Sequence, residues 1–118
     1  MQYQAREQGI ARNYPQAARQ IILADGAPAG RLVVARAEGE IRVVDIAVLP
    51  QQQNRGIGGA AMRELIEESN REGKPLRLTV NNVNAAIRFY ENLGFRRIGG
   101  DETQHFMERT PTREPAET

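Results

Sequence analysis

The segment EIRVVDIAVLP, residues 40–50, constrains the fold of this chain more than any other segment. It is rich in β-branched residues and almost continuously apolar from Val43 to Leu49, with Asp45 as the only charged residue in that run. Such a run predicts a strand that is covered on both faces, as in the middle of an α/β sheet. The rest of the chain must then supply neighbouring strands and the helices that cover them.

The segments around this strand carry the patterns of its expected neighbours. Residues 20–25 and 31–37 predict a β-hairpin, because the turn residues DGAPAG lie between them. Residues 58–72 predict a helix, since their apolar side chains form one stripe and Gly73 is a good C-terminal stop. The remaining predicted elements are a helix over residues 1–13, a strand over 74–80, a helix that begins at Asn84 and closes at Gly94, and strands over 96–99 and 104–109. Together these elements predict one mixed α/β domain over residues 1–109, followed by a frayed tail over 110–118.

Composition narrows the possible classes of function. The chain has 118 residues, enough for one domain, and its 40% hydrophobic and 26% charged residues are typical of a globular protein. A net charge of +1 gives no electrostatic case for a nucleic-acid partner. The absence of cysteine excludes disulfides and thiolate metal sites, and because His105 is the only histidine we expect no metal.

The sequence also has no apolar run of the roughly 20 residues that a membrane helix needs. The opening residues MQYQAREQ lack the apolar core of a signal peptide. We therefore expect a cytoplasmic protein without a membrane partner.

A glycine-rich segment, QQQNRGIGGA at residues 51–60, separates the central strand from the following helix. It does not form a P-loop, which requires a lysine after the glycines. The dinucleotide-binding pattern G-x-G-x-x-[GA] is matched by Gly56, Gly58 and Ala61. That alternative is weak, because residues 50–55 separate the strand from the first glycine and the next strand ends without an acidic residue.

Two motifs together resemble the GNAT superfamily of acetyl-coenzyme A-dependent N-acetyltransferases. The string QNRGIG, residues 53–58, follows AVLP and resembles the pyrophosphate loop of that family, Q/R-x-x-G-x-G/A. The segment AAIRFYENLGF resembles its A-x-x-x-Y-x-x-x-G-F helix, with matches at Ala86, Tyr90, Gly94 and Phe95. The motifs lie about thirty residues apart in the order of the family, and the resemblance spans roughly residues 20–109.

The resemblance implies a GNAT-like acyl-CoA N-acyltransferase fold and transfer of an acetyl group from acetyl-coenzyme A to an amine by direct attack. It implies a small-molecule or protein amine as the acceptor, and no metal. The chemistry of the loop agrees, since glycines allow close backbone approach and a helix N-terminus favours phosphates. The coenzyme-binding residues implied are Ala47, Val48, Gln53, Asn54, Arg55, Gly56, Ile57, Gly58, Gly59, Asn84 and Tyr90. An alternative of another class is a non-catalytic coenzyme A-binding sensor or assembly module.

Tyr90 and Asp45 are the candidate catalytic residues. The resemblance implies that Tyr90 protonates the departing thiolate, while a backbone N–H near Val48 stabilises the oxyanion. The alternative is that Tyr90 packs its ring with Phe89 and Phe95. Asp45 is a candidate base for the amine, because a carboxylate among apolar residues suits that task. The alternative for Asp45 is an ion pair with one of three arginines, Arg31, Arg42 or Arg77, and weaker candidates for the base are Glu40 and His105.

The sequence departs from the family pattern in two places. Val83 stands where the family has an asparagine that contacts the coenzyme, and Asn84 is expected to cap the helix instead. The chain also begins without the strand and helix that open a typical member. We therefore expect the apolar strand QIILA, residues 20–24, at an edge of the sheet, where a homodimer or a partner chain covers it and rebuilds part of the acceptor pocket. The alternative is a monomer in which the helix of residues 1–13 folds over this edge.

Overall fold

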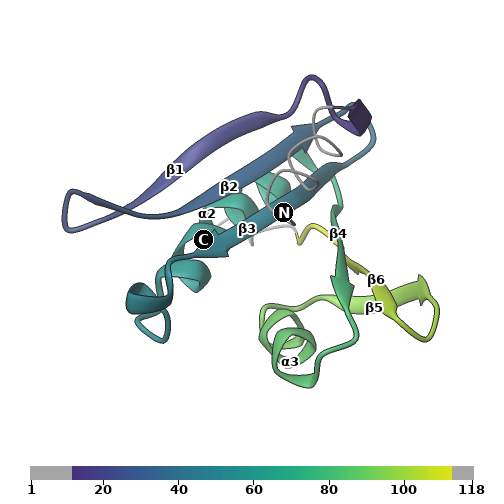
Figure 1. Cartoon of the computed structure of the whole chain (residues 1–118). Coiled ribbons are helices and arrows are strands. Elements are labelled where there is room, and N and C mark those ends of the chain that lie inside the picture. The colour runs from purple at the N-terminus through teal and green to yellow at the C-terminus, as the bar shows by residue number, and fades with distance from the viewer. Residues whose placement is uncertain (1–11, 113–118) are drawn as a thin grey trace.

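The structure, a computed structural model, describes residues 12–112, which form one sheet with two α-helices (Figure 1). The strands are β1 (Ala18–Ala24), β2 (Ala27–Arg36), β3 (Ile41–Val48), β4 (Leu76–Asn81), β5 (Arg96–Gly100) and β6 (Gln104–Arg109), and the helices are α2 (Ile57–Glu72), α3 (Asn84–Asn92) and the short 3₁₀ turn η1 (Pro50–Gln52). Most of the predicted helix over residues 1–13 and most of the predicted tail over 110–118 lie outside the described residues, and the two described residues of that helix, 12 and 13, are helical. Every other predicted element is present, so the predicted mixed α/β fold is confirmed.

The six strands lie in the order β1-β2-β3-β4-β6-β5. Only β3 and β4 are parallel, and α2 connects them, while all other neighbours are antiparallel. The apolar run that predicted a central strand is β3, with β2 on one side and β4 on the other. In Figure 1, α2 crosses one face of the first three strands and α3 lies next to the second half of the sheet.

The two halves of the sheet separate within the β3–β4 pair. These strands are paired only from Ile41 opposite Leu76 to Val43 opposite Leu78. At that point β3 has a bulge. Val34 of β2 pairs with Val43 and the adjacent Val33 pairs with Asp45, so Val44 between them is an extra residue without a partner in β2. A bulge bends its strand and increases the local twist. Beyond it, β3 continues beside β2 and β4 continues beside β6, so the two strands diverge (Figure 1).

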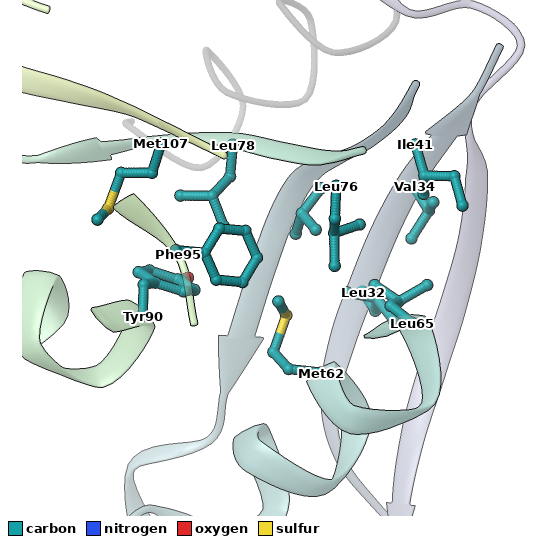
Figure 2. Close-up of a cluster of buried hydrophobic side chains, with 11 residues drawn as sticks. Leu32, Val34, Ile41, Met62, Leu65, Leu76, Leu78, Tyr90, Phe95 and Met107 are labelled. Atoms are coloured by element: carbon teal, nitrogen blue, oxygen red, sulfur yellow. The ribbon is translucent and has the colours of Figure 1, made fainter. Parts of the chain in front are cut away.

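The hydrophobic core lies between the sheet and the two helices (Figure 2). Met62 and Leu65 of α2 pack on the strand residues that face them, and Met62 is fully buried. Tyr90 of α3 joins the same cluster from the other half of the sheet. The strand and loop residues of the cluster are Leu32, Val34, Ile41, Val43, Leu76, Leu78, Phe95 and Met107. The core therefore holds both halves of the sheet together although β3 and β4 share few backbone pairs.

The ends of the helices agree with the prediction in two places and contradict it in a third. Gly73 ends α2 in the left-handed conformation, and Gly94 follows α3 with a φ of +98°. The prediction that Asn84 caps α3 is wrong, because Val83 is the N-cap and no side chain caps the helix. The preceding loop is fixed instead by Asn82, whose backbone N–H donates to Thr103 O at 2.9 Å and whose side chain donates to the Glu102 carbonyl at 3.2 Å.

Candidate active site

A cleft of about 730 Å³ opens where β3 and β4 separate. One wall is the end of β3, the second is the glycine loop with the start of α2, and the third is one face of α3. Its lining residues are Ile46, Val48, Gln52, Gln53, Asn54, Gly56, Ile57, Gly58, Gly59, Ala85, Ala86, Phe89 and Tyr90. The fold thus brings the two sequence motifs, which are about thirty residues apart, to one place.

The backbone of β3 offers hydrogen-bonding groups to this cleft. Leu49 N donates to Ala29 O at 2.7 Å, so these residues form a hydrogen-bonded pair between β3 and β2. Because such pairs alternate with non-hydrogen-bonded pairs, the N–H and C=O groups of Val48 and Ile46 face away from β2. They face the side from which β4 has diverged. Gln53 Nε2 donates to the carbonyl of Val48 at 3.0 Å.

The glycine loop leaves the N-terminus of α2 open. Gly56 is the N-cap with a φ of +77°, a left-handed conformation that favours glycine, and Asn54 before it has a φ of +65°. No side chain caps the helix, and its first turn contains no acidic residue. The first backbone N–H groups of a helix have no intrahelical partner and carry the positive end of the helix dipole. This end of α2 is therefore suited to an anion such as a phosphate.

Gly58 keeps the cleft open between two apolar side chains. A Cβ atom at this position would lie 3.8 Å from Phe89 Cζ and 3.8 Å from Val48 Cγ2, which is ordinary van der Waals contact. The packing of the protein itself therefore tolerates alanine here, although glycine in a helix costs up to about 1 kcal/mol relative to alanine. A larger side chain would fill the space between Val48 and Phe89. The packing of the fold thus does not require a glycine at this position.

The Y-x-x-x-G-F motif fixes the position of Tyr90. Phe95 N donates to Tyr90 O at 3.1 Å and Gly94 N donates to Glu91 O at 3.0 Å, which are the two hydrogen bonds of a Schellman motif. The motif requires a left-handed residue at Gly94 and places Phe95 next to Tyr90. Their ring centroids are 5.6 Å apart, and the ring centroids of Phe89 and Tyr90 are 5.0 Å apart. The ring contacts that were the alternative interpretation of Tyr90 are therefore present, and Tyr90 also lines the cleft.

Tyr90 is protonated at neutral pH. Its relative exposure is 9%. Burial raises the pKa of the phenol above its ordinary value, and the negative charge of Asp45 raises it further. A neutral phenol can donate a hydrogen bond or a proton to a group in the cleft.

Asp45 forms an ion pair with Arg31. The Nε and Nη2 atoms of Arg31 are both 2.9 Å from Asp45 Oδ2, and 12% of the Asp45 side chain is exposed. The other two candidate arginines, Arg42 and Arg77, instead donate to Glu40, each at 3.0 Å. Asp45 does not line the cleft, but its charge acts on Tyr90.

Glu40 belongs to a network of ion pairs on the strands. Arg77 also donates to Glu108 at 2.9 Å, and Arg96 lies 3.3 Å from Glu108. Burial alone would raise the pKa of Glu40, but the hydrogen bonds from Arg77 and Arg42 lower it on balance. A carboxylate that is held in its ionised form by two guanidinium groups is a poor proton acceptor at neutral pH.

Three predicted coenzyme-binding residues do not line the cleft. Arg55 instead lines the groove between β1 and α2, where its guanidinium lies 3.4 Å from Asp25 Oδ2. Asn84 is exposed at the start of α3. The side chain of Ala47 lies in a second hollow with Pro28, on the opposite face of β3.

Sequence reasoning missed five residues that line the cleft, namely Ile46, Gln52, Ala85, Ala86 and Phe89. The spacing of the last three with Tyr90 marks one face of a helix, and this signal could have identified them. Within residues 12–112 no group of three or more acidic, histidine or cysteine side chains could hold a metal ion. None of the helices described is long and apolar enough to cross a membrane.

Comparisons with known proteins agree with this geometry and identify an acetyltransferase. The sequence model described as "Acetyltransferase (GNAT) domain" matches residues 16–97. The chain belongs to the GNAT acetyltransferase family. A search of curated proteins found no significant match.

Solved structures of GNAT acetyltransferases have the same fold. The ribosomal-protein-S18-alanine N-acetyltransferase of Escherichia coli aligns with a TM-score of 0.76 and 24% identity over 95% of this chain and 80% of that chain. A GNAT family acetyltransferase of Elizabethkingia anophelis, solved with acetyl-CoA bound, aligns with a TM-score of 0.75 and 16% identity over 88% and 82%. Ard1 of Thermoplasma volcanium aligns with a TM-score of 0.71 and 24% identity over 93% and 80%. Identities this low support the fold and not a particular acceptor.

Proposed function

We propose that this acetyltransferase binds acetyl-coenzyme A in the cleft between β3 and α3 and transfers the acetyl group to an amine. The observation that carries the proposal is the separation of β3 and β4, which brings the backbone of β3, the N-terminus of α2 and Tyr90 to one cleft. The similar enzyme of Elizabethkingia anophelis contains acetyl-CoA, which adds support.

The residues of the cleft fit the parts of the coenzyme. The open N-terminus of α2, from Gly56 to Gly59, would hold the pyrophosphate through backbone N–H groups. An extended arm of the ligand would exchange hydrogen bonds with the backbone of Ile46 and Val48, as an added strand does. The coenzyme supplies an activated thioester next to these groups.

Tyr90 would act as the general acid. The amine nitrogen forms a bond to the carbonyl carbon, the carbon–sulfur bond breaks, and the phenol proton passes to the departing thiolate. A backbone N–H of Ile46 or Val48 would stabilise the oxyanion. Because Tyr90 is protonated at neutral pH, its proton is available at the start of each cycle. Solvent returns a proton to Tyr90 afterwards.

Asp45 or a chain of water molecules would accept the proton that the amine loses. The effect of its charge on Tyr90 supports a place for Asp45 near the reaction, while the ion pair with Arg31 fits a structural role equally well. Asp45→Asn separates the two roles. The substitution removes the ion pair in either case, so the pH profile of kcat decides between the roles. Loss of a base lowers kcat at neutral pH and removes the acid limb of its pH profile, whereas loss of a structural ion pair alone leaves the shape of that profile unchanged.

A screen of amine acceptors with acetyl-coenzyme A tests the proposed function. The release of free thiol is measured for small amines, amino acids and peptide amines, and we expect release that depends on the amine. Calorimetry with coenzyme A is measured in parallel. Binding without amine-dependent thiol release would assign the chain to the non-catalytic coenzyme A-binding class, and absence of binding would contradict both functions.

A further inference from the structure

The two edges of the sheet differ in how they are protected. At the β5 edge the strand is short, its register with β6 is interrupted between Arg97 and Gly99, and the Arg97 side chain donates to the carbonyls of Gly99 and Asp101 at 2.9 and 3.3 Å. Short strands, bulges and charged side chains are the usual devices that prevent an edge from pairing with another strand. The β5 edge therefore has three such devices.

The β1 edge has fewer of these devices. Its register with β2 also shifts, between Ile22 and Leu23, but the extra residue, Ala29, lies on β2 and not on the edge strand. Residues 20–24 contain no charged residue, proline or glycine, and no strand among residues 12–112 pairs with their outer side. Ile21 and Leu23 are 64% and 61% exposed. On the other face of β1, toward α2, lies a groove of about 520 Å³ whose lining includes the apolar Ile57 and Ala60 and the charged Asp25, Arg55 and Glu64. An apolar edge of this kind is a template for a further strand.

The register of the hairpin determines which backbone groups are available at this edge. Arg31 is in a hydrogen-bonded pair with β3, so its partner Ile21 in β1 directs its N–H and C=O outward. Leu23 is two residues from Ile21 along the strand, so its N–H and C=O point to the same side as those of Ile21. Its partner in β2 is Pro28, which has no N–H to donate to Leu23. Ile21 and Leu23 therefore both present backbone donors and acceptors to the outside.

We propose that the β1 edge binds the β1 edge of a second copy of this chain, antiparallel, with the two-fold axis at Ile22. In this register Ile21 of one copy lies opposite Leu23 of the other, and both have outward backbone groups, so each of the two symmetric pairs can exchange two hydrogen bonds. The two Ile22 side chains face each other as a non-hydrogen-bonded pair, which brings side chains closest. The result is one continuous sheet across both copies.

Side-chain chemistry favours the same register. The exposed Ile21 and Leu23 side chains of both copies form one apolar cluster across the axis. Arg19 of each copy lies near the hairpin turn of the other, which carries Asp25, so opposite charges come close at both ends of the interface. Asp25 also lies 3.4 Å from Arg55 of its own copy. The proposal concerns assembly and does not depend on acetyl transfer.

A single cysteine tests the register, because the chain contains no cysteine of its own. In the proposed dimer the two Cα atoms of residue 22 are about 4.5 Å apart, which lies within the range of a disulfide. We expect the full-length Ile22→Cys variant to form a covalent dimer under mild oxidation. Ile98→Cys, at the exposed β5 edge, is the matched control and should remain monomeric on a non-reducing gel. Equal cross-linking of both variants, or none at residue 22, overturns the register.

Light scattering after size exclusion tests the interface itself. We expect the wild type to be a dimer at about 100 µM, and Ile21→Lys to raise the dimer dissociation constant at least tenfold while Ile98→Lys leaves it unchanged. Both substitutions are at exposed positions, so neither is expected to unfold the monomer, and circular dichroism checks this. A wild-type monomer throughout the concentration range overturns the proposal, as does a dimer that Ile21→Lys does not weaken.

Discussion

Replacement of Gly58 should separate the binding of coenzyme from the stability of the fold. In Gly58→Val, the Cβ atom fits at 3.8 Å from Val48 and Phe89, but the two added methyl groups enter the space that the ligand would occupy. We expect the affinity for coenzyme A to fall by more than tenfold, or about 1.4 kcal/mol. In Gly58→Ala, the higher helix propensity should stabilise the protein by up to about 1 kcal/mol, while the affinity falls less.

Isothermal titration calorimetry with coenzyme A measures the affinity, and thermal unfolding without ligand measures the stability. Gly39→Val is the matched control, because a Cβ atom at this exposed turn would have no neighbour within 4 Å. Its affinity should equal that of the wild type. Equal affinities of Gly58→Val and wild type would refute the argument that this glycine keeps the cleft open, and would place the ligand elsewhere.

Three further predictions follow from the site and the core. Tyr90→Phe keeps the ring contacts and removes the proton donor, so turnover should fall about 10²-fold with little change in coenzyme affinity. Unchanged turnover would mean that Tyr90 has only a packing role. Leu76→Ala removes a fully buried side chain from the core, and should lower the free energy of unfolding by about 2–5 kcal/mol in urea titrations. The pKa of Glu40 is lowered in the folded state, so its contribution to stability is present above the ordinary value of 4.5 and is lost as the pH falls below it. Glu40→Gln should therefore lose less stability than the wild type between pH 6 and about pH 3, and an equal loss would contradict this.

The elements of the fold could be predicted because their signals are local. The β-branched run of residues 41–48, the stripe of α2 and the stops at Gly73 and Gly94 each depend on residues that are near in sequence. The Y-x-x-x-G-F motif was informative for the same reason, since the hydrogen bonds that fix Tyr90 all lie within six residues.

The geometry of the site could not be predicted in the same way, because it depends on contacts between distant segments. The bulge at Val44 and the separation of β3 from β4 follow from the register between strands. Asp45 had three candidate partners, and the sheet order selects Arg31. Arg55 was expected at the coenzyme, but its side chain lies outside the cleft and contacts Asp25, which is thirty residues away in the sequence. Asn84 was expected to cap α3, but the loop anchored by Asn82 places Val83 there.

Backbone amide shifts on addition of coenzyme A test the central claim most directly. In ¹⁵N–¹H spectra of the full chain, we predict that the amides of Ile46, Val48 and Gly58 shift together with those of α3 that line the cleft. The amides of Ile21 and Leu23, which border the separate groove between β1 and α2, should not move. Shifts confined to that groove, or no shifts at saturating coenzyme, would contradict the assignment of the cleft as the acetyl-coenzyme A site.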